Sequence, residues 1–268
     1  MKLKCYQVDA FTDQVFGGNP AAVVILEEWL DDMRLRSIAA ENNLSETAFV
    51  VSEGNQLGLR WFTPKAEVDL CGHATLGAAH VLFHHLDHQA EAIHFSSRSG
   101  LLTVRREASG YCMDFPAVEM DPVAQAPADL IEGFSGHRPA QLFLGVDYLA
   151  VFEDESALTD LAPDFSALLR LQGRGVIATA PGRDYDFVSR CFYPKLGVDE
   201  DPVTGSAHCQ VAPYWAQRLG RSELRAYQRS LRGGEVNCRV RGERVELTGH
   251  AVTFLQGQIE LADTAIHS

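Results

Sequence analysis

The chain has no long apolar run, no paired cysteine spacing and no excess of positive charge. Its longest purely aliphatic stretch, residues 21–26, is far too short to cross a membrane. The first residues alternate and then meet Asp9, so we expect no secretory segment and no membrane partner. The cysteines are scattered at positions 5, 71, 112, 191, 209 and 238. This scatter favours reduced thiols in a cytoplasmic protein.

The charge balance argues against nucleic acid as a partner. The formal net charge is −13 at pH 7, whereas a nucleic-acid-binding protein normally has a positive balance. Eight arginines fall between Arg218 and Arg244, but glutamates lie among them, so we interpret this segment as a salt-bridged surface. The sequence also lacks a dinucleotide-binding glycine motif, a P-loop and a lipase-type serine elbow. We therefore expect no nucleotide cofactor.

One ten-residue pattern occurs twice in the chain. Residues 60–69 and 190–199 share the same residue at six positions: Arg60/Arg190, Phe62/Phe192, Pro64/Pro194, Lys65/Lys195, Val68/Val198 and Asp69/Asp199. Each copy leads into a glycine turn and a small-residue helix start. The offset from residue 60 to residue 190 is 130 residues, near half of the 268-residue chain, which predicts two similar domains. Two similar polar turns that face each other would form a cleft.

The predicted elements favour an α+β fold. Strands outnumber helices and few βαβ units appear, so a Rossmann sheet is disfavoured. The helix expected over residues 72–86 is apolar nearly all round its first half, which predicts a buried helix wrapped by strands. The predicted domains are an N-terminal domain over 1–115 with a return strand at 250–268, a proline-containing linker over 116–127, and a C-terminal domain over 128–249.

Glu46 is the first candidate for chemistry. It lies where a predicted helix gives way to a strand, and apolar residues follow at 49–51. Because desolvation disfavours the charged form, we expect a raised pKa for this carboxyl. A carboxyl of that kind can give and take protons near neutral pH. The alternative is a surface glutamate at an element boundary.

His73 and Asp201 lie at the two turns. His73 follows Gly72 at a helix start, where it could orient a substrate, shuttle a proton or merely cap the helix. The free N–H groups of a helix start bind carboxylates, and the turn at Gly205 offers the same groups. Pro202 holds Asp201 extended just before that second turn. A solvated acid is the alternative interpretation of Asp201.

Cys71 raises a competing mechanism. A racemase with two thiols needs a second cysteine at the matching turn, but residues 202–204 are Pro-Val-Thr. His80, His84 and His88 share one helix face at the spacing of some metal sites, and we interpret them as a solvated helix end. A third hypothesis, from another class, is a protein that binds a small acid without turnover.

Five segments, in order along the chain, resemble the PhzF family, the phenazine biosynthesis-like isomerases that share the diaminopimelate epimerase fold. They are residues 9–12 with 16–21, then 43–49, 60–64, 69–77 and 200–208. The resemblance implies two similar domains, each a barrel-like sheet wrapped around a central helix, with the site in the cleft between them. It also suggests a cytoplasmic homodimer with no metal or organic cofactor.

The resemblance also implies roles for individual residues. Glu46 would be the acid/base residue, with His73 and Asp201 in support. The residues that would line the substrate pocket are Asn19, Gly72, Gly205 and Ser206.

The family's namesake reaction moves a proton along a dihydro-hydroxyanthranilate ring, with one carboxyl removing a proton and returning one elsewhere. We therefore predict a cofactor-independent isomerase that moves a proton on a small carboxylate-bearing substrate. The alternatives are a cysteine-dependent amino-acid racemase or epimerase, and a non-catalytic protein that binds small acids.

Overall fold

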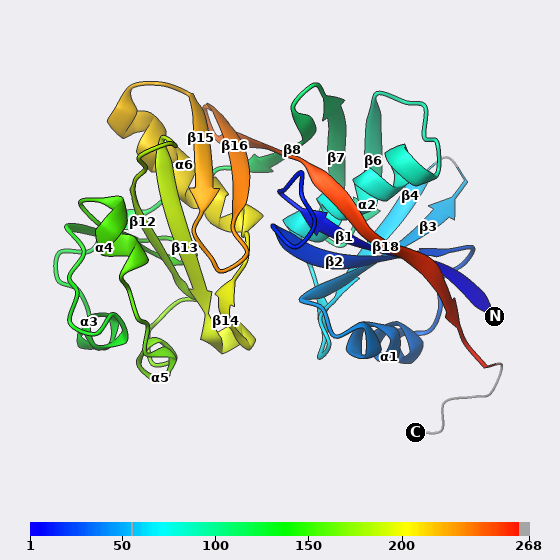
Figure 1. Cartoon of the computed structure of the whole chain (residues 1–268), viewed down its shortest axis with the longest axis horizontal. Coiled ribbons are helices and arrows are strands. Elements are labelled where there is room, and N and C mark those ends of the chain that lie inside the picture. Colours follow the sequence, from blue (N-terminus) through cyan, green and yellow to red (C-terminus); the bar gives the residue numbers. More distant parts are fainter. Residues whose placement is uncertain (55, 263–268) are drawn as a thin grey trace. The chain divides into compact units, whose positions relative to one another are not determined.

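The chain folds into two compact units in the computed structural model, which describes residues 1–54 and 56–262. One unit is Met1–Asp114 joined by Thr248–Ser268, and the other is Phe115–Leu247 (Figure 1). Among the described residues, no helix has the length and apolar character needed to span a membrane.

The first unit is built on a mixed sheet. Its strands pair in the order β18–β1–β2–β3–β4–β6–β7–β8, and the short β5 pairs with β4. The β2–β3 and β4–β6 pairs are parallel, and the others are antiparallel. The strands are β1 (Lys2–Ala10), β2 (Asn19–Leu26), β3 (Glu46–Glu53), β4 (Gln56–Phe62), β5 (Glu67–Val68), β6 (Ala92–Ser97), β7 (Gly100–Glu107), β8 (Gly110–Pro116) and β18 (Ala251–Glu260).

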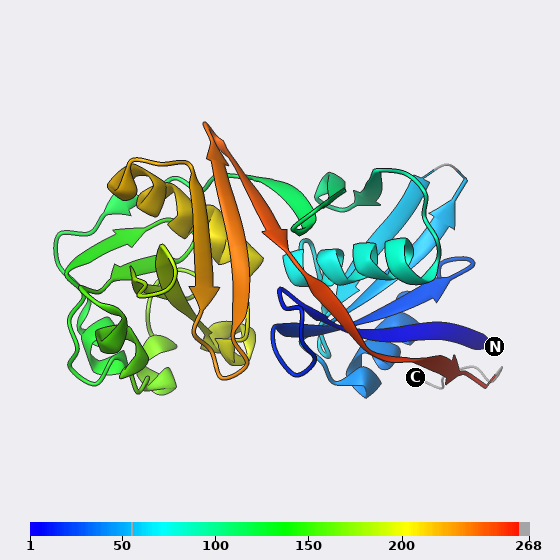
Figure 2. The same ribbon diagram turned by 45° about the horizontal axis from the view of Figure 1, so that its top comes forward.

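Helix α2 (Gly72–His85) is the buried centre of the first unit. Every residue from His73 to Phe83 is buried. The helix packs against β1, β2, β3 and β18, and Figure 2 shows it in cyan alongside the blue strands. The prediction of a buried helix wrapped by strands is confirmed, because an all-round apolar helix needs neighbours on every side.

Helix α1 (Asp32–Asn42) determines where Glu46 enters the sheet. Asp31 caps the helix by accepting a hydrogen bond from the Arg34 N–H at 2.9 Å. Asn43 ends it in the left-handed region, at φ 49°, a conformation that asparagine adopts more readily than most residues. The chain then turns so that Glu46 is the first residue of β3, in parallel register with Ala21 of β2.

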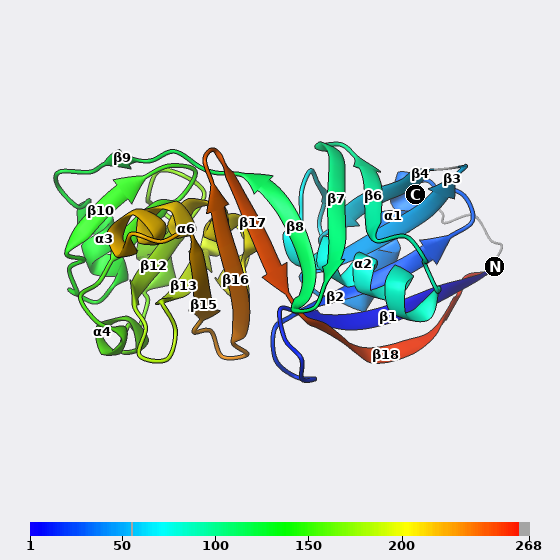
Figure 3. The same cartoon turned by 90° about the horizontal axis from the view of Figure 1, so that it is seen from above.

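The second unit repeats this architecture around α6 (Gly205–Leu219) (Figure 3). Its strands pair in the order β9–β10–β11–β12–β13–β15–β16–β17, with β11–β12 and β13–β15 parallel. The strands are β9 (Asp121–Pro122), β10 (Gln141–Leu144), β11 (Tyr148–Val151), β12 (Val176–Pro181), β13 (Phe187–Tyr193), β14 (Val198–Asp201), β15 (Glu223–Gln228), β16 (Gly234–Arg241) and β17 (Arg244–Gly249). The short helices are α3 (Ala128–Gly133), α4 (Glu155–Thr159), α5 (Phe165–Leu168) and the 3₁₀ turn η1 (Pro194–Leu196).

The predicted duplication is confirmed by the order of pairing and by one repeated contact. In each unit the parallel and antiparallel pairs follow in the same sequence along the sheet, and the long helix follows the matching short strand. Arg60 makes a two-point salt bridge to Glu67 at 2.7 Å and lies 5.1 Å from the Phe62 ring centroid. In the second unit, Arg190 pairs with Glu200 at 2.8 and 2.9 Å and lies 5.1 Å from the Phe192 ring centroid. The fold is therefore the predicted α+β fold of two similar domains.

The predicted linker over residues 116–127 belongs instead to the second unit. Asp121 and Pro122 form β9, which pairs with β10, and the Val123 N–H donates to the Leu142 carbonyl at 2.8 Å. Proline is tolerated at a sheet edge, so the prolines of this segment do not exclude a strand. In the second unit β9 occupies the position in the strand order that β18 occupies in the first. The predicted return strand is present as β18, while residues 263–268 lie outside the described residues.

The arginine-rich segment runs from the end of α6 through β15 and β16 to the start of β17. Its interpretation as a salt-bridged surface is confirmed. Arg225 pairs with Glu235 at 3.3 Å, and Arg239 pairs with Glu223 at 3.0 Å. Cross-strand pairs of this kind place charged residues at alternate positions of each strand. The strand then has fewer apolar residues by which its sequence could be recognised.

Candidate active site

Three titratable side chains meet at the start of α2. Oε2 of Glu46 lies 3.1 Å from Nε2 of His73, and Sγ of Cys71 lies 3.5 Å from Nδ1 of the same ring. The side chains of Glu46 and His73 are 19% and 7% exposed, and Cys71 is buried. The predicted pair Glu46 and His73 is therefore brought together, with Gly72 between the thiol and the imidazole in the chain.

Ser45 links this group to β2. Its Oγ lies 3.1 Å from Oδ1 of Asn19, 3.1 Å from the Pro20 carbonyl and 3.3 Å from Nε2 of His73. Asn19 is fully buried, so it contacts the site through the serine hydroxyl. Ser45 was not predicted as a site residue, although it lies in segment 43–49, which carried the resemblance.

The electrostatics of Glu46 differ from the prediction. Burial alone would raise its pKa, but the neighbouring His73, with further contacts from Ser45 and Cys71, outweighs burial and lowers the pKa below its ordinary value. The predicted raised pKa is therefore wrong. The sequence shows the apolar residues that follow Glu46, but it does not show that α2 places an imidazole beside this carboxyl. Glu46 is a carboxylate at neutral pH.

His73 carries the matching positive charge. Burial alone would lower its pKa, but the contacts with Cys71 and Glu46 raise it well above its ordinary value. Burial and the charge of Glu46 raise the pKa of Cys71, so this thiol is protonated at neutral pH. The Glu46 carboxylate is therefore the anion that stabilises the protonated imidazole of His73. At 3.1 Å the imidazole is not aligned for a hydrogen bond, and Oε2 is buried without an aligned donor among the described residues.

The Glu46–His73 pair is expected to stabilise the fold most in one pH window. The lowered pKa of Glu46 contributes stability above its unfolded value of 4.5, and this is lost as pH falls through the lower folded value. The raised pKa of His73 contributes stability below its unfolded value of 6.5, and this is lost as pH rises through the folded value. Urea unfolding should show the largest difference from Glu46→Gln/His73→Asn between these two pH values. A difference that does not vary with pH would contradict this assignment of charges.

The remaining predicted residues lie at the start of α6 in the second unit. Thr204 is the N-cap residue, and its hydroxyl donates to the Asp201 carboxylate. Its N–H donates to Oε1 of Gln228 at 2.8 Å, and Nε2 of Gln228 donates to the Asp201 carbonyl at 2.6 Å. Gly205 and Ser206 follow as the first residues of the helix. The predicted group of Asp201, Gly205 and Ser206 is therefore local to this turn.

Two residues beside this turn were not predicted. Nη2 of Arg174 donates to Oγ of Ser206 at 3.2 Å and to Oδ2 of Asp147 at 2.6 Å. Neither residue lies near the turn in the sequence, and no local pattern marks them. The sheet brings them to the start of α6, which only the fold reveals.

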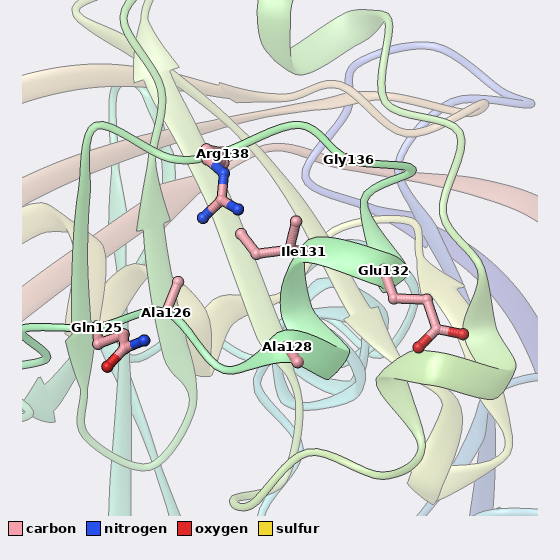
Figure 4. Close-up of a pocket in the computed structure, with 7 residues that line it drawn as sticks. All are labelled: Gln125, Ala126, Ala128, Ile131, Glu132, Gly136 and Arg138. Atoms are coloured by element: carbon pink, nitrogen blue, oxygen red, sulfur yellow. The ribbon is translucent and has the colours of Figure 1, made fainter.

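Other titratable clusters and pockets lie apart from the candidate residues. The prediction of a solvated helix end is wrong for His80, which is buried and whose ring nitrogens lie 3.1 Å from the Tyr111 hydroxyl and 2.8 Å from Oγ1 of Thr253. A pocket of about 460 Å³ lies in the second unit, and Glu132 and Arg138 are its ionisable lining residues (Figure 4). Glu132 pairs with Arg170 at 2.6 Å, and no predicted site residue lines this pocket.

Known proteins resemble this chain over nearly its whole length. The family model described as phenazine biosynthesis-like protein matches residues 8–257. An uncharacterized isomerase of Pseudomonas aeruginosa is 53% identical, with 97% of this chain and 100% of the relative covered. The human phenazine biosynthesis-like domain-containing protein is 39% identical, with 97% and 99% covered. A crystal structure of a PhzF family protein from Enterococcus faecalis superposes with a TM-score of 0.94 at 47% identity, over 97% of this chain and 100% of the other. The chain therefore belongs to the PhzF family of phenazine biosynthesis-like isomerases.

Proposed function

We propose that this isomerase moves a proton on a small carboxylate-bearing substrate, with Glu46 as the single acid/base residue. The observation that carries the proposal is the buried Oε2 of Glu46, which has no aligned hydrogen-bond donor among the described residues. A carboxylate with a free lone pair and a lowered pKa is in the form that accepts a proton at neutral pH.

The proposed reaction has two proton steps. Oε2 of Glu46 accepts a proton from a substrate carbon, and the C–H electron pair stays on the substrate as a delocalised carbanion. The protonated Glu46 then returns a proton to another carbon, which leaves the substrate isomerised and the carboxylate restored. The imidazolium of His73, 3.1 Å away, keeps Glu46 ionised before the first step. Low exposure limits competition from water.

The other predicted residues have supporting roles in this proposal. Asn19 positions Ser45, and Ser45 positions the imidazole. Gly205 at the start of α6 provides helix N–H groups for a carboxylate, and Gly72 offers such groups separately at the start of α2. Ser206 adds a hydroxyl, and Asp201 orders the second turn through Thr204.

Labelling from heavy water tests the proposal. The protein is incubated in heavy water with a panel of small carboxylic acids that carry an acidic C–H bond, and deuterium is followed by mass spectrometry. We expect at least one acid to take up deuterium at carbon and to yield an isomer. Tight binding of an acid with no label in any of the panel would favour the non-catalytic alternative.

A second candidate function is a thiol-dependent racemase, and the 3.5 Å contact between Cys71 and His73 favours it. We expect Cys71→Ser to keep the labelling rate within about tenfold of wild type, since the thiol is neutral and general acid/base catalysis supplies about 10²–10⁴-fold. The matching N-cap of α6 is Thr204, so a second thiol is missing there. The measurements are the initial labelling rate of Cys71→Ser and the labelling rate of wild type after treatment with iodoacetamide. A loss of about 100-fold, or inactivation by the reagent, would support the racemase instead.

The remaining parts of the proposal concern cofactors, assembly and location. We propose that no metal or organic cofactor is needed, although the donor atoms of Glu46, Cys71 and His73 lie within 4.8 Å of one another, a spacing that could hold a metal ion. Labelling at an unchanged rate after dialysis against EDTA is the expected result. A cytoplasmic homodimer is also proposed, and light scattering would measure its mass.

A further inference from the structure

A buried carboxylate holds an arginine beside the start of α6. Asp147 is 1% exposed and accepts hydrogen bonds from Nε of Arg174 at 3.0 Å and from Nη2 at 2.6 Å. The guanidinium lies 5.0 Å from the ring centroid of Tyr193, whose hydroxyl donates to Asp147 at 3.3 Å. Two-point pairing and stacking hold the planar guanidinium in one orientation.

The backbone around this pair is also fixed. Gln210 of α6 donates Nε2 to the Asp147 carbonyl at 2.7 Å and accepts a hydrogen bond from the Asp147 N–H at 3.2 Å. Gly175 follows Arg174, and a Cβ there would lie 2.2 Å from Cδ1 of Tyr193, so the close approach requires glycine. Arg174 is thus ordered before any ligand binds, which lowers the entropic cost of using it as an anchor.

The ordered guanidinium still has hydrogen-bonding capacity. Its Nη2 reaches Oγ of Ser206 at 3.2 Å, while no residue in the described chain accepts a hydrogen bond from Nη1. Because Ser206 accepts from the arginine, its own hydroxyl proton is left for another acceptor. The side chain of Arg174 is 33% exposed, so part of it remains open to solvent. The first-turn N–H groups of α6 add partial positive charge at the same place.

We infer that Arg174 selects the anionic group of the substrate by binding a carboxylate through Nη1, next to the Ser206 hydroxyl. The inference rests on the proposed function in one respect. The proposed function places the substrate carboxylate at Gly205 and Ser206, and the inference adds Arg174 as the cation that binds it. Asp147 acts through the guanidinium and is a positioning residue. Lysine cannot replace the arginine, since one ammonium cannot pair with Asp147 at two points and present a further planar donor group.

Benzoate is the probe for this inference, and benzamide is its neutral counterpart. Each is titrated into ¹⁵N-labelled protein while the amide resonances of Gly205 and Ser206 are followed. We expect wild type to bind benzoate about tenfold or more tightly than benzamide, and Arg174→Lys to lose most of that preference. The Asp147→Asn/Arg174→Met variant should lose it completely. That variant removes both charges, so no unpaired carboxylate stays buried. Arg138→Met, which removes an exposed arginine from the pocket of Figure 4, is the matched control and should keep the preference.

Either of two results would overturn the inference. One is wild-type protein whose amides at the start of α6 respond no better to benzoate than to benzamide. The other is a variant at position 174 that melts cooperatively and keeps the wild-type preference. Arg174→Lys carries the test if the double variant does not fold. Binding is read without turnover, and Glu46→Gln should keep the preference. Wild-type protein that prefers benzoate but labels no acid of the panel would therefore count against the acid/base proposal alone.

Discussion

Glu46→Gln is expected to lower the rate of deuterium uptake into the substrate by about 10²–10⁴-fold, the usual contribution of a general acid/base group. The amide has the size of the carboxyl and fills the same space between Ser45 and His73, but it cannot accept a proton from carbon. Rates are measured in heavy water with the acid identified by the labelling panel. Urea unfolding of the same variant checks that the fold is kept.

Glu41→Gln is the matched control for this variant. Glu41 lies five residues earlier, is exposed on α1, and makes the same change of charge without touching the site. It should label at the wild-type rate. A Glu46→Gln protein that is folded and labels as fast as wild type would remove Glu46 from the proposed reaction.

His73→Asn should move the acidic limb of the pH–rate profile to higher pH. In wild type, the neighbouring His73 offsets the effect of burial and lowers the pKa of Glu46, so the carboxyl stays deprotonated at acidic pH values down to that pKa. Without the imidazole, burial dominates and the pKa of Glu46 rises, so more of the carboxyl is protonated at a given acidic pH. We expect the labelling rate to fall by about tenfold or more at pH values below the new limb, since each pKa unit is a factor of ten in the base form.

The plateau at higher pH separates this role from direct proton transfer by His73. If the imidazole acts only on Glu46, the rate of His73→Asn should recover much of its value as pH rises. A rate that stays about 100-fold low at every pH would make His73 itself a proton carrier. His137→Asn, at an exposed histidine of the second unit, is the control and should leave the profile unchanged.

The sequence was sufficient to predict features that repeat or have a period. The all-round apolar pattern of residues 72–86 predicted the buried helix, because every side of α2 faces other parts of the first unit. The pattern shared by residues 60–69 and 190–199 predicted the duplication. The two copies even share their arginine–aromatic contact, although Glu67 lies inside the first copy and Glu200 follows directly after the second.

Features that depend on distant contacts were not predictable in the same way. The sign of the Glu46 pKa shift depends on His73, which comes from another element, 27 residues later in the chain. Arg174 and Asp147 are brought to Ser206 by strand order, and their flanking sequences carry no motif. The sequence does not predict the two-residue strand β9, because so short a strand depends on its pairing with β10 and shows no alternation of apolar and polar residues.

The most direct measurement of the central claim uses substrate deuterated at the carbon that loses its proton, in ordinary water. If one partly buried carboxyl takes the deuteron and returns it, a fraction of the early product carries deuterium at the second carbon. That is the expected result, because Glu46 is only 19% exposed and exchange with water competes with return. Product that carries only solvent hydrogen at the second carbon, from the first turnovers onward, would contradict the return of the same hydron by one carboxyl shielded from water.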